Sequence, residues 1–169
     1  MRLFIAIQFD QNVLNALTDA QNVLRKRHFC GQYSIVENLH MTLAFIGEYD
    51  EPDKVLGAIE KVQYKPFEIT LGGYIGHFGN LLWASLENNP ELEDYTKELR
   101  QMLAEGDIPF WKKKFIPHIT LLRNAESKRR FSDIAVKKET MTVRRIDLMR
   151  SDLLQNDEIY TKIGSIDLM

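Results

Sequence analysis

Two short segments of the chain carry the same pattern of histidine, any residue, threonine and leucine. The first begins at His40 and the second at His118, 78 residues later (118 − 40). Each pattern lies in an apolar run rich in β-branched residues, which predicts a β-strand. A single copy is most simply a histidine packed at a sheet edge, because short motifs often arise by chance. Two copies in matching contexts indicate a shared function.

Alternation along a strand determines which of these side chains can act together. Residues i and i+2 point to the same face, so His40 is expected beside Thr42 and His118 beside Thr120. The opposite faces are then expected to belong to the core, and they carry Met41, Leu43, Phe45, Ile119 and Leu121.

The polar faces would supply a complete set of groups for attack at a phosphodiester. Histidine titrates near neutrality, so one ring can act as a base while the other acts as an acid. The hydroxyls of Thr42 and Thr120 can donate hydrogen bonds to an anion held between the rings. The guanidinium of Arg123 could form two hydrogen bonds to phosphate oxygens. Simple alternation puts Arg123 on the opposite face, so it reaches the site only if its strand bulges or ends near Leu122.

These residues resemble the 2H phosphoesterase family, and within it the RNA 2′,3′-cyclic phosphodiesterases, which are also called 2′-5′ RNA ligases. The matching stretches are residues 2–7, 37–47 and 115–123, with a weaker match at Ser151 and Tyr160. The likeness spans nearly the whole chain. Leu122 departs from the family pattern, which usually has a small Ala there. We expect a bulkier side chain at this position to narrow the phosphate pocket or to shift Arg123.

The resemblance implies an enzyme that hydrolyses RNA 2′,3′-cyclic phosphate ends, or nucleoside 2′,3′-cyclic phosphates, to 2′-phosphomonoesters. It implies His40 as proton donor and His118 as proton acceptor, although the near-symmetric motifs alone do not separate these roles. Thr42, Thr120 and Arg123 would bind the phosphate, with no metal and no cofactor. Two aromatic residues near the motifs are candidates for stacking on a base, Phe78 and Phe115.

Three alternatives remain open. His40 and His118 could bind a metal, although a catalytic zinc usually has three protein ligands and neither motif offers another at clear spacing. The chain could be a non-catalytic module that binds RNA ends, which predicts binding without turnover. It could instead join RNA through a 2′-5′ bond, or cleave another cyclic nucleotide. The motif residues would bind phosphate and not the base, so they suit each of these reactions.

The amino-acid composition indicates what kind of protein would carry out this chemistry. A chain of 169 residues with 44% apolar and 27% charged residues is expected to form one soluble domain, residues 1–169, with two lobes. A net charge of −2 disfavours a broad basic surface that binds a long stretch of nucleic acid. It still allows a local basic patch at the rim of a binding site. Lys112, Lys113 and Lys114 are either a solvated loop or such a rim, and the flanking Trp111 and Phe115 could stack on a base.

The single cysteine, Cys30, fits a reducing cytoplasm. No apolar run has the length of a signal peptide or a membrane span. We therefore expect a cytoplasmic protein without a membrane partner, and nothing in the sequence implies an obligate protein partner.

The remaining pattern predicts an α+β fold. Strands are expected at about 2–9, 39–46, 67–71, 81–86, 139–150 and 158–167, besides the strand of the second motif, and helices at about 11–27, 52–62 and 89–103. Residues 72–80 are glycine-rich and predict the loop of a hairpin, and residues 128–130 a surface helix or loop. The two halves look like distant copies. Mainly antiparallel sheets would then surround a central cleft, with helices outside and one histidine strand from each lobe.

Overall fold

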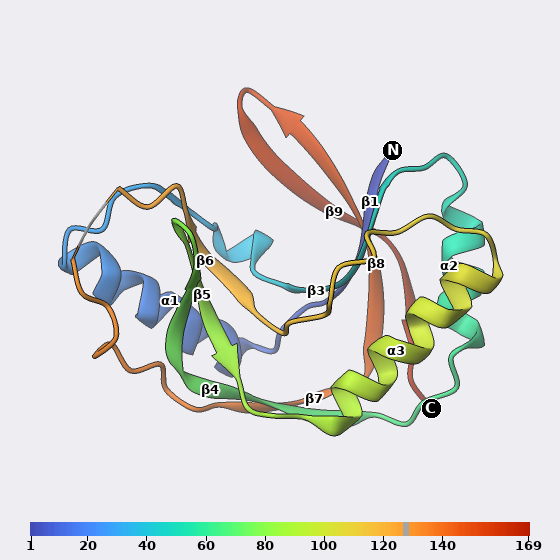
Figure 1. The fold of residues 1–169 in the computed structure, drawn as a ribbon, viewed down its shortest axis with the longest axis horizontal. Helices are drawn as coiled ribbons and strands as arrows, with labels where there is room; N and C mark the ends of the chain where they lie inside the picture. The colour runs from blue at the N-terminus through green and yellow to red at the C-terminus, as the bar shows by residue number, and fades with distance from the viewer. Residues whose placement is uncertain (127–128) are drawn as a thin grey trace.

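The chain forms two antiparallel sheets in a computed structural model, which describes residues 1–126 and 129–169. The first sheet has the strand order β3-β1-β8-β9, and its strands are β1 (Arg2–Ile7), β3 (Met41–Glu48), β8 (Arg145–Leu154) and β9 (Asp157–Asp167). The second has the order β2-β6-β5-β4-β7, and its strands are β2 (Gln32–Tyr33), β4 (Phe67–Phe78), β5 (Leu81–Leu86), β6 (Ile119–Arg123) and β7 (Thr140–Val143). The predicted two-lobed α+β fold is confirmed (Figure 1).

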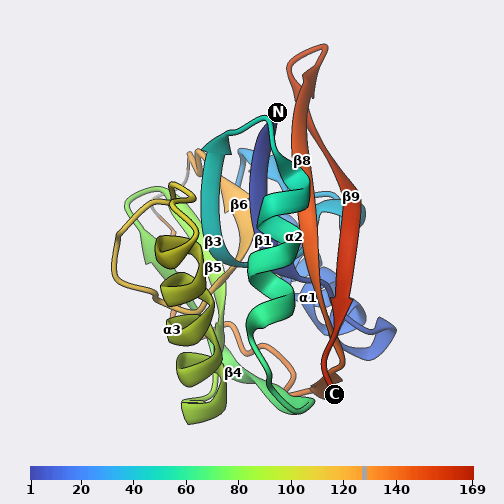
Figure 2. The same ribbon diagram turned by 90° about the vertical axis from the view of Figure 1, so that its right-hand side faces the viewer.

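Three α-helices cover the sheets, and a 3₁₀ helix, η1 (Val36–Asn38), precedes the first motif. The helix α2 (Pro52–Lys61) lies over the first sheet, and α3 (Pro90–Glu105) lies beside α2 and contacts β3 of the first sheet and β4 of the second (Figure 2). The helix α1 (Gln11–Lys26) follows β1 of the first sheet but contacts β6 and β7 of the second. Helix α3 in turn follows β5 of the second sheet and contacts β3 of the first. The chain therefore crosses between the lobes several times.

Each motif enters a different sheet. His40 comes immediately before β3, and Met41, Leu43 and Ala44 on that strand are buried. His118 comes immediately before β6, on which Ile119, Leu121 and Leu122 are fully buried. The apolar residues of the two motifs thus anchor the strands in the core, and the polar residues remain free to face the space between the sheets.

Two predicted boundaries are wrong. The glycine-rich residues 72–78 are not a loop, because β4 continues to Phe78 and the hairpin turn is confined to Gly79 and Asn80. Residues 139–150 are not one strand, because the chain leaves the second sheet after Val143 and enters the first at Arg145. The first prediction failed because the glycines at 72, 73 and 76 lie within a strand, and the second because the apolar pattern does not record a change of strand partner.

The β8–β9 hairpin extends beyond the body of the first sheet (Figures 1 and 2). Its turn is formed by Gln155 and Asn156, which both have positive φ (51° and 70°). Lys128 lies outside the described residues, and residues 129–139 contain neither helix nor strand.

Candidate active site

A cavity of about 710 Å³ lies between the two sheets. Four of the predicted site residues line it, namely His40, Thr42, Thr120 and Arg123. The first pair comes from the first sheet and the second pair from the other, so the cavity joins the two lobes. Its remaining wall includes Phe4 of β1, residues 32–35, and the end of the β8–β9 hairpin.

The His40 ring is held on both of its nitrogens. Its Nδ1 lies 2.7 Å from the carbonyl oxygen of Asn38, and its Nε2 lies 2.8 Å from the Thr42 hydroxyl oxygen. A carbonyl can only accept, so Nδ1 carries the hydrogen and donates it. In the neutral ring Nε2 is then the acceptor, and the Thr42 hydroxyl donates to it.

The His118 ring repeats the same anchoring. Its Nδ1 lies 2.6 Å from the carbonyl oxygen of Ile116, again two residues earlier, and therefore donates to it. The ring meets Phe78 edge-on at 5.1 Å between centroids, and Trp83 at 6.1 Å. In both motifs Nδ1 is anchored to a carbonyl, so Nε2 is the atom that could transfer a proton, and in His40 this atom already bonds the Thr42 hydroxyl.

Burial and positive neighbours favour the neutral form of both rings. The pKa of His40 is lowered to about 4, mainly by burial and also by the charges of Arg123 and His118, while the Asn38 carbonyl and Glu158 act in the opposite direction. Burial likewise lowers the pKa of His118, and Arg123 adds to this. Arg123 therefore lies within electrostatic reach of both imidazoles, and His118 within reach of His40.

Strand β6 bulges immediately after its motif threonine. Thr120 pairs with Trp83 of β5, but the next residue of β5, Leu82, pairs with Leu122, so Leu121 is an extra residue. A bulge of this kind shifts the alternation of every later side chain. Arg123, three residues after Thr120, consequently lines the cavity. This is the irregularity that the sequence required if Arg123 were to reach the site.

Strand β3 has a bulge at the equivalent position. Thr42 pairs with Ala6 of β1 and Ala44 pairs with Ile5, so Leu43 is the extra residue. Phe45, three residues after Thr42, is therefore half-buried and lines the cavity. The expectation that Phe45 faces the core was wrong, because simple alternation fails at the bulge.

A helix side chain bonds the carbonyl oxygen of each extra leucine. The Leu43 oxygen accepts from Arg100 of α3, at 3.2 Å from Nε and 3.0 Å from Nη2. The Leu121 oxygen accepts from Nε2 of Gln21 of α1 at 3.0 Å and from the Ser34 amide at 3.0 Å. Gln21 is only 2% exposed. A bulge interrupts the ladder, and a buried carbonyl without a donor is costly, so these side chains stabilise the bulges.

The other predicted residues have different positions. Phe78 is 42% exposed and lies against His118. Phe115 is partly buried against the core, with the Arg100 guanidinium 5.6 Å from its ring centroid, and is not among the residues that line the cavity. Leu122 is fully buried in the core and is likewise absent from that wall, so its bulk does not narrow the cavity.

Residues of the β8–β9 hairpin also line the cavity, and the spacing of the motifs did not predict them. The Tyr160 ring meets His40 edge-on at 5.2 Å, and its hydroxyl donates to Glu158 at 2.7 Å. Burial and Glu158 raise the pKa of Tyr160 to about 12, although Arg123 acts against this rise. Tyr160 and Ser151 pair across the hairpin and both line the cavity. The weaker family match at these two positions was the only signal in the sequence.

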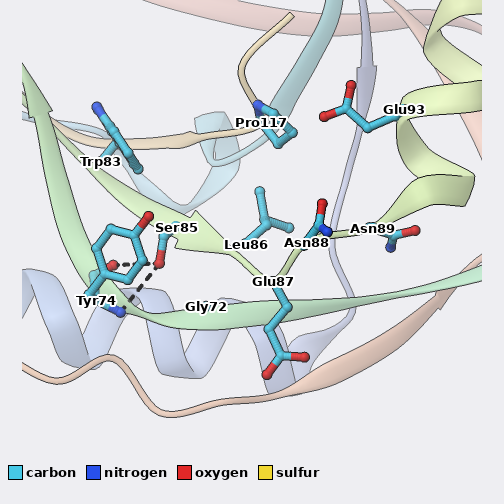
Figure 3. Close-up of a pocket in the computed structure, with 10 residues that line it drawn as sticks. All are labelled: Gly72, Tyr74, Trp83, Ser85, Leu86, Glu87, Asn88, Asn89, Glu93 and Pro117. Atoms are coloured by element: carbon cyan, nitrogen blue, oxygen red, sulfur yellow. Dashed lines mark hydrogen bonds between the residues drawn. The ribbon is translucent and has the colours of Figure 1, made fainter.

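A second cavity, of about 420 Å³, lies on β4 and β5 beside the start of α3 (Figure 3). The Ser85 hydroxyl in its wall accepts from the amide of Tyr74 and donates to the carbonyl of the same residue. Glu87 and Glu93 line this cavity, and no lysine or arginine does. Its charge therefore disfavours phosphate, in contrast to the cavity between the sheets.

The described residues contain neither a cluster of metal ligands nor a membrane-spanning helix. No group of three or more His, Cys, Asp or Glu side chains is arranged to hold a metal ion in residues 1–126 and 129–169. Over the same residues, no helix combines the length and apolar character needed to cross a bilayer.

Comparisons with known proteins identify related sequences. The family model described as the 2′-5′ RNA ligase superfamily matches residues 10–154. A Thermus thermophilus protein named RNA 2′,3′-cyclic phosphodiesterase is 33% identical over 99% of this chain and 90% of its own length. A Thermotoga maritima protein of the same name is also 33% identical, over 73% of this chain and 70% of its own.

Solved structures extend the likeness to the whole fold. A crystal structure of a Thermus thermophilus protein is 27% identical, with a TM-score of 0.85 over 99% of this chain and 98% of that one. The crystal structure of Escherichia coli LigT in apo form has a TM-score of 0.84 over 99% of this chain and 96% of that one. At 24% identity, this second match shows the fold alone.

The buried bond from Gln21 to the β6 bulge predicts a large effect on stability. Gln21→Leu keeps the volume but removes the donor to the Leu121 and Ser34 oxygens. We expect the free energy of unfolding to fall by about 1–3 kcal/mol in urea denaturation, because both carbonyls lose a buried partner. The control is Gln101→Leu on exposed α3, for which we expect a change within about 0.5 kcal/mol. Equal effects of the two substitutions would contradict the role of Gln21.

Proposed function

The chain belongs to the 2′-5′ RNA ligase superfamily, and from this premise we propose that it is an RNA 2′,3′-cyclic phosphodiesterase that forms 2′-phosphomonoesters. The observation that carries the proposal is that residues of both motifs line one cavity; His118 is not among the lining residues but lies within electrostatic reach of His40. Thr42 and Thr120 come from different sheets and line the same space, and each has an anchored imidazole two residues earlier. This arrangement suits a phosphate that must be approached from one side and released from the other.

The reaction is a single in-line displacement at phosphorus. A water molecule attacks phosphorus while Nε2 of His118 accepts its proton. The bond from phosphorus to the 3′ oxygen breaks, and Nε2 of His40 gives that oxygen a proton. The 2′ oxygen keeps the phosphate, and exchange with solvent restores both rings. Thr42, Thr120 and Arg123 bind the non-bridging oxygens, whose charge grows as water adds.

The assignment of His40 as the acid follows the resemblance to the family. Glu158 favours the protonated form of His40, whereas no carboxylate is among the groups that shift the pKa of His118. Both rings are neutral in the free protein near pH 7, because their pKa values are lowered. An anionic phosphate between them would stabilise an imidazolium, and Glu158 opposes part of the effect of burial at His40.

The proposal also covers the binding of the base, the absence of a metal from the scheme and the cellular compartment. The base of the terminal nucleotide is assigned to the aromatic side chains near the motifs, and Phe78 beside His118 is better placed for this than the partly buried Phe115. The scheme uses no metal. We propose a cytoplasmic protein with residues 1–169 as one two-lobed domain, and the single cysteine supports a reducing compartment.

Product analysis tests the reaction directly. The protein is incubated with a nucleoside 2′,3′-cyclic phosphate in excess chelator, and the products are separated by chromatography. We expect turnover to the 2′-phosphate at the rate measured without chelator. The 3′-phosphate as product, or loss of activity that added metal restores, would contradict the scheme. Binding without turnover would identify a module that only recognises RNA ends.

Removal of either imidazole is expected to abolish most of the activity. For His40→Ala and for His118→Ala we expect kcat to fall by roughly a hundredfold or more, since each proton transfer contributes on that order. Circular dichroism and urea denaturation should show that both variants remain folded. His28→Ala is the matched control, because His28 lies on the turn after α1 and does not line the cavity. A loss confined to one of the two motif variants would contradict two-histidine catalysis.

The lowered pKa values predict a particular pH dependence. Activity needs one neutral and one protonated ring, and both free-protein pKa values lie below 6.5. We therefore expect a bell-shaped profile of kcat/KM with both limbs below pH 6.5. Bound phosphate raises the pKa of the acid, so the alkaline limb of kcat should lie at higher pH. Coincident alkaline limbs in the two profiles would contradict this electrostatic account.

A further inference from the structure

An exposed pair of aromatic rings forms part of the cavity wall. Trp111 is 55% exposed, and its ring lies 4.5 Å from that of Phe45 between centroids. The Trp111 amide donates to the Phe45 carbonyl oxygen at 2.9 Å, which fixes the loop to β3. Both residues line the cavity of the two motifs. A tryptophan whose role was core packing would be covered, whereas this ring is held in place and still open to solvent.

Two cations flank this pair. The Arg2 guanidinium carbon lies 5.0 Å from the centroid of Phe45, and the Lys113 ammonium lies 5.6 Å from that of Trp111. The Lys113 carbonyl oxygen accepts from Arg100 at 2.6 Å, so the backbone carrying this charge is also fixed. In the described part of the chain, neither Arg2 nor Lys113 forms an ion pair with an acidic side chain.

The pair lies a short distance along the strand from the first motif. Phe45 follows Thr42 by three residues, and the bulge at Leu43 turns both toward the cavity. Three strand residues span at most about 10 Å. A phosphate held at Thr42 therefore has the aromatic pair within reach of the next part of a nucleic acid strand.

We propose that Trp111, Phe45, Arg2 and Lys113 form a subsite for single-stranded RNA on the 5′ side of the terminal nucleotide. The base before the cyclic end stacks on the exposed face of Trp111, and Arg2 and Lys113 contact the backbone phosphates beside it. The inference rests on the proposed function for the location of the cyclic end. Aromatic rings with neighbouring cations are the usual means of holding a single strand without sequence preference.

The net charge of the chain fits a short contact of this kind. At −2 the protein lacks the charge to coat a long nucleic acid, so its cations must act locally. The subsite would give the enzyme a preference for RNA ends over free cyclic mononucleotides, which the motif residues cannot provide because they contact phosphate alone.

The test compares two substrates in two variants. The ratio of kcat/KM for a trinucleotide ending in 2′,3′-cyclic phosphate to kcat/KM for the cyclic mononucleotide is measured. We expect Trp111→Ala to lower this ratio about tenfold, since stacking of one base is lost, and Trp111→Phe to restore most of it. Tyr74→Ala is the control, because Tyr74 is similarly exposed, at 54%, and does not line the cavity. An unchanged ratio in Trp111→Ala would overturn the proposal.

A binding measurement separates this inference from the proposed reaction. A trinucleotide ending in 2′-phosphate is titrated into each protein, which requires no turnover. We expect Trp111→Ala to weaken its binding about tenfold and Tyr74→Ala to leave it unchanged. Weaker binding in Trp111→Ala, with no hydrolysis by the unaltered protein, would keep the subsite and reject the proposed reaction. Hydrolysis by the unaltered protein with equal binding by all variants would reject the subsite alone.

The cations provide a second readout. For Arg2→Gln and for Lys113→Gln, we expect the slope of log Kd against log salt for the trinucleotide to fall by about 0.7, the value for one phosphate contact in a single strand. Lys61→Gln at the end of α2, away from the cavity, should leave the slope unchanged. An unchanged slope in both Arg2→Gln and Lys113→Gln would remove the phosphate contacts from the proposal.

Discussion

A hydrogen bond to one carbonyl oxygen in each sheet determines the shape of the site. Both motif strands carry an extra residue after the threonine, Leu43 in β3 and Leu121 in β6. These leucines are fully buried, so the loss of a donor to either oxygen is costly, and the Leu121 oxygen also accepts from the Ser34 amide. Arg100 and Gln21 supply the donors from helices that follow strands of the opposite sheet. The crossing of the chain between the lobes thus brings a stabilising donor to each bulge.

The repeated bulge explains how two similar motifs can do different work. In each strand it turns the residue three positions after the threonine toward the cavity. That residue is Phe45 in β3 and Arg123 in β6, so one side of the cavity gains an aromatic surface and the other a cation. Glu158 adds a second difference, because it acts on the pKa of His40. An arrangement that is nearly symmetric in its imidazoles and hydroxyls is therefore asymmetric in its charges.

The sequence predicted what depends on residue type and local period. The motifs, the helices and the two-lobed fold follow from apolar spacing and from residues such as Asn89, whose side chain caps α3 as its type suggests. The bulges could not be predicted, because a bulge is defined by the register of a partner strand far along the chain. Their only trace is a pair of adjacent apolar residues after each threonine, such as Leu121 and Leu122, where alternation demands a polar one. Tyr160 was hard to assign for the same reason, since it reaches His40 only through the pairing of β8 with β1.

The charges of the cavity are balanced for a state that includes an anion. Arg123 and burial lower the pKa values of both imidazoles, so the free site avoids placing three positive charges together. In the pH range between about 4 and 6.5 the folded chain then binds fewer protons at His40 than the unfolded chain, and its stability falls as the pH is lowered through this range. A bound phosphate reverses this penalty, because it attracts the proton that the empty cavity rejects. The substrate itself would therefore create the acid needed for its own cleavage, and a neutral analogue of the same shape could not.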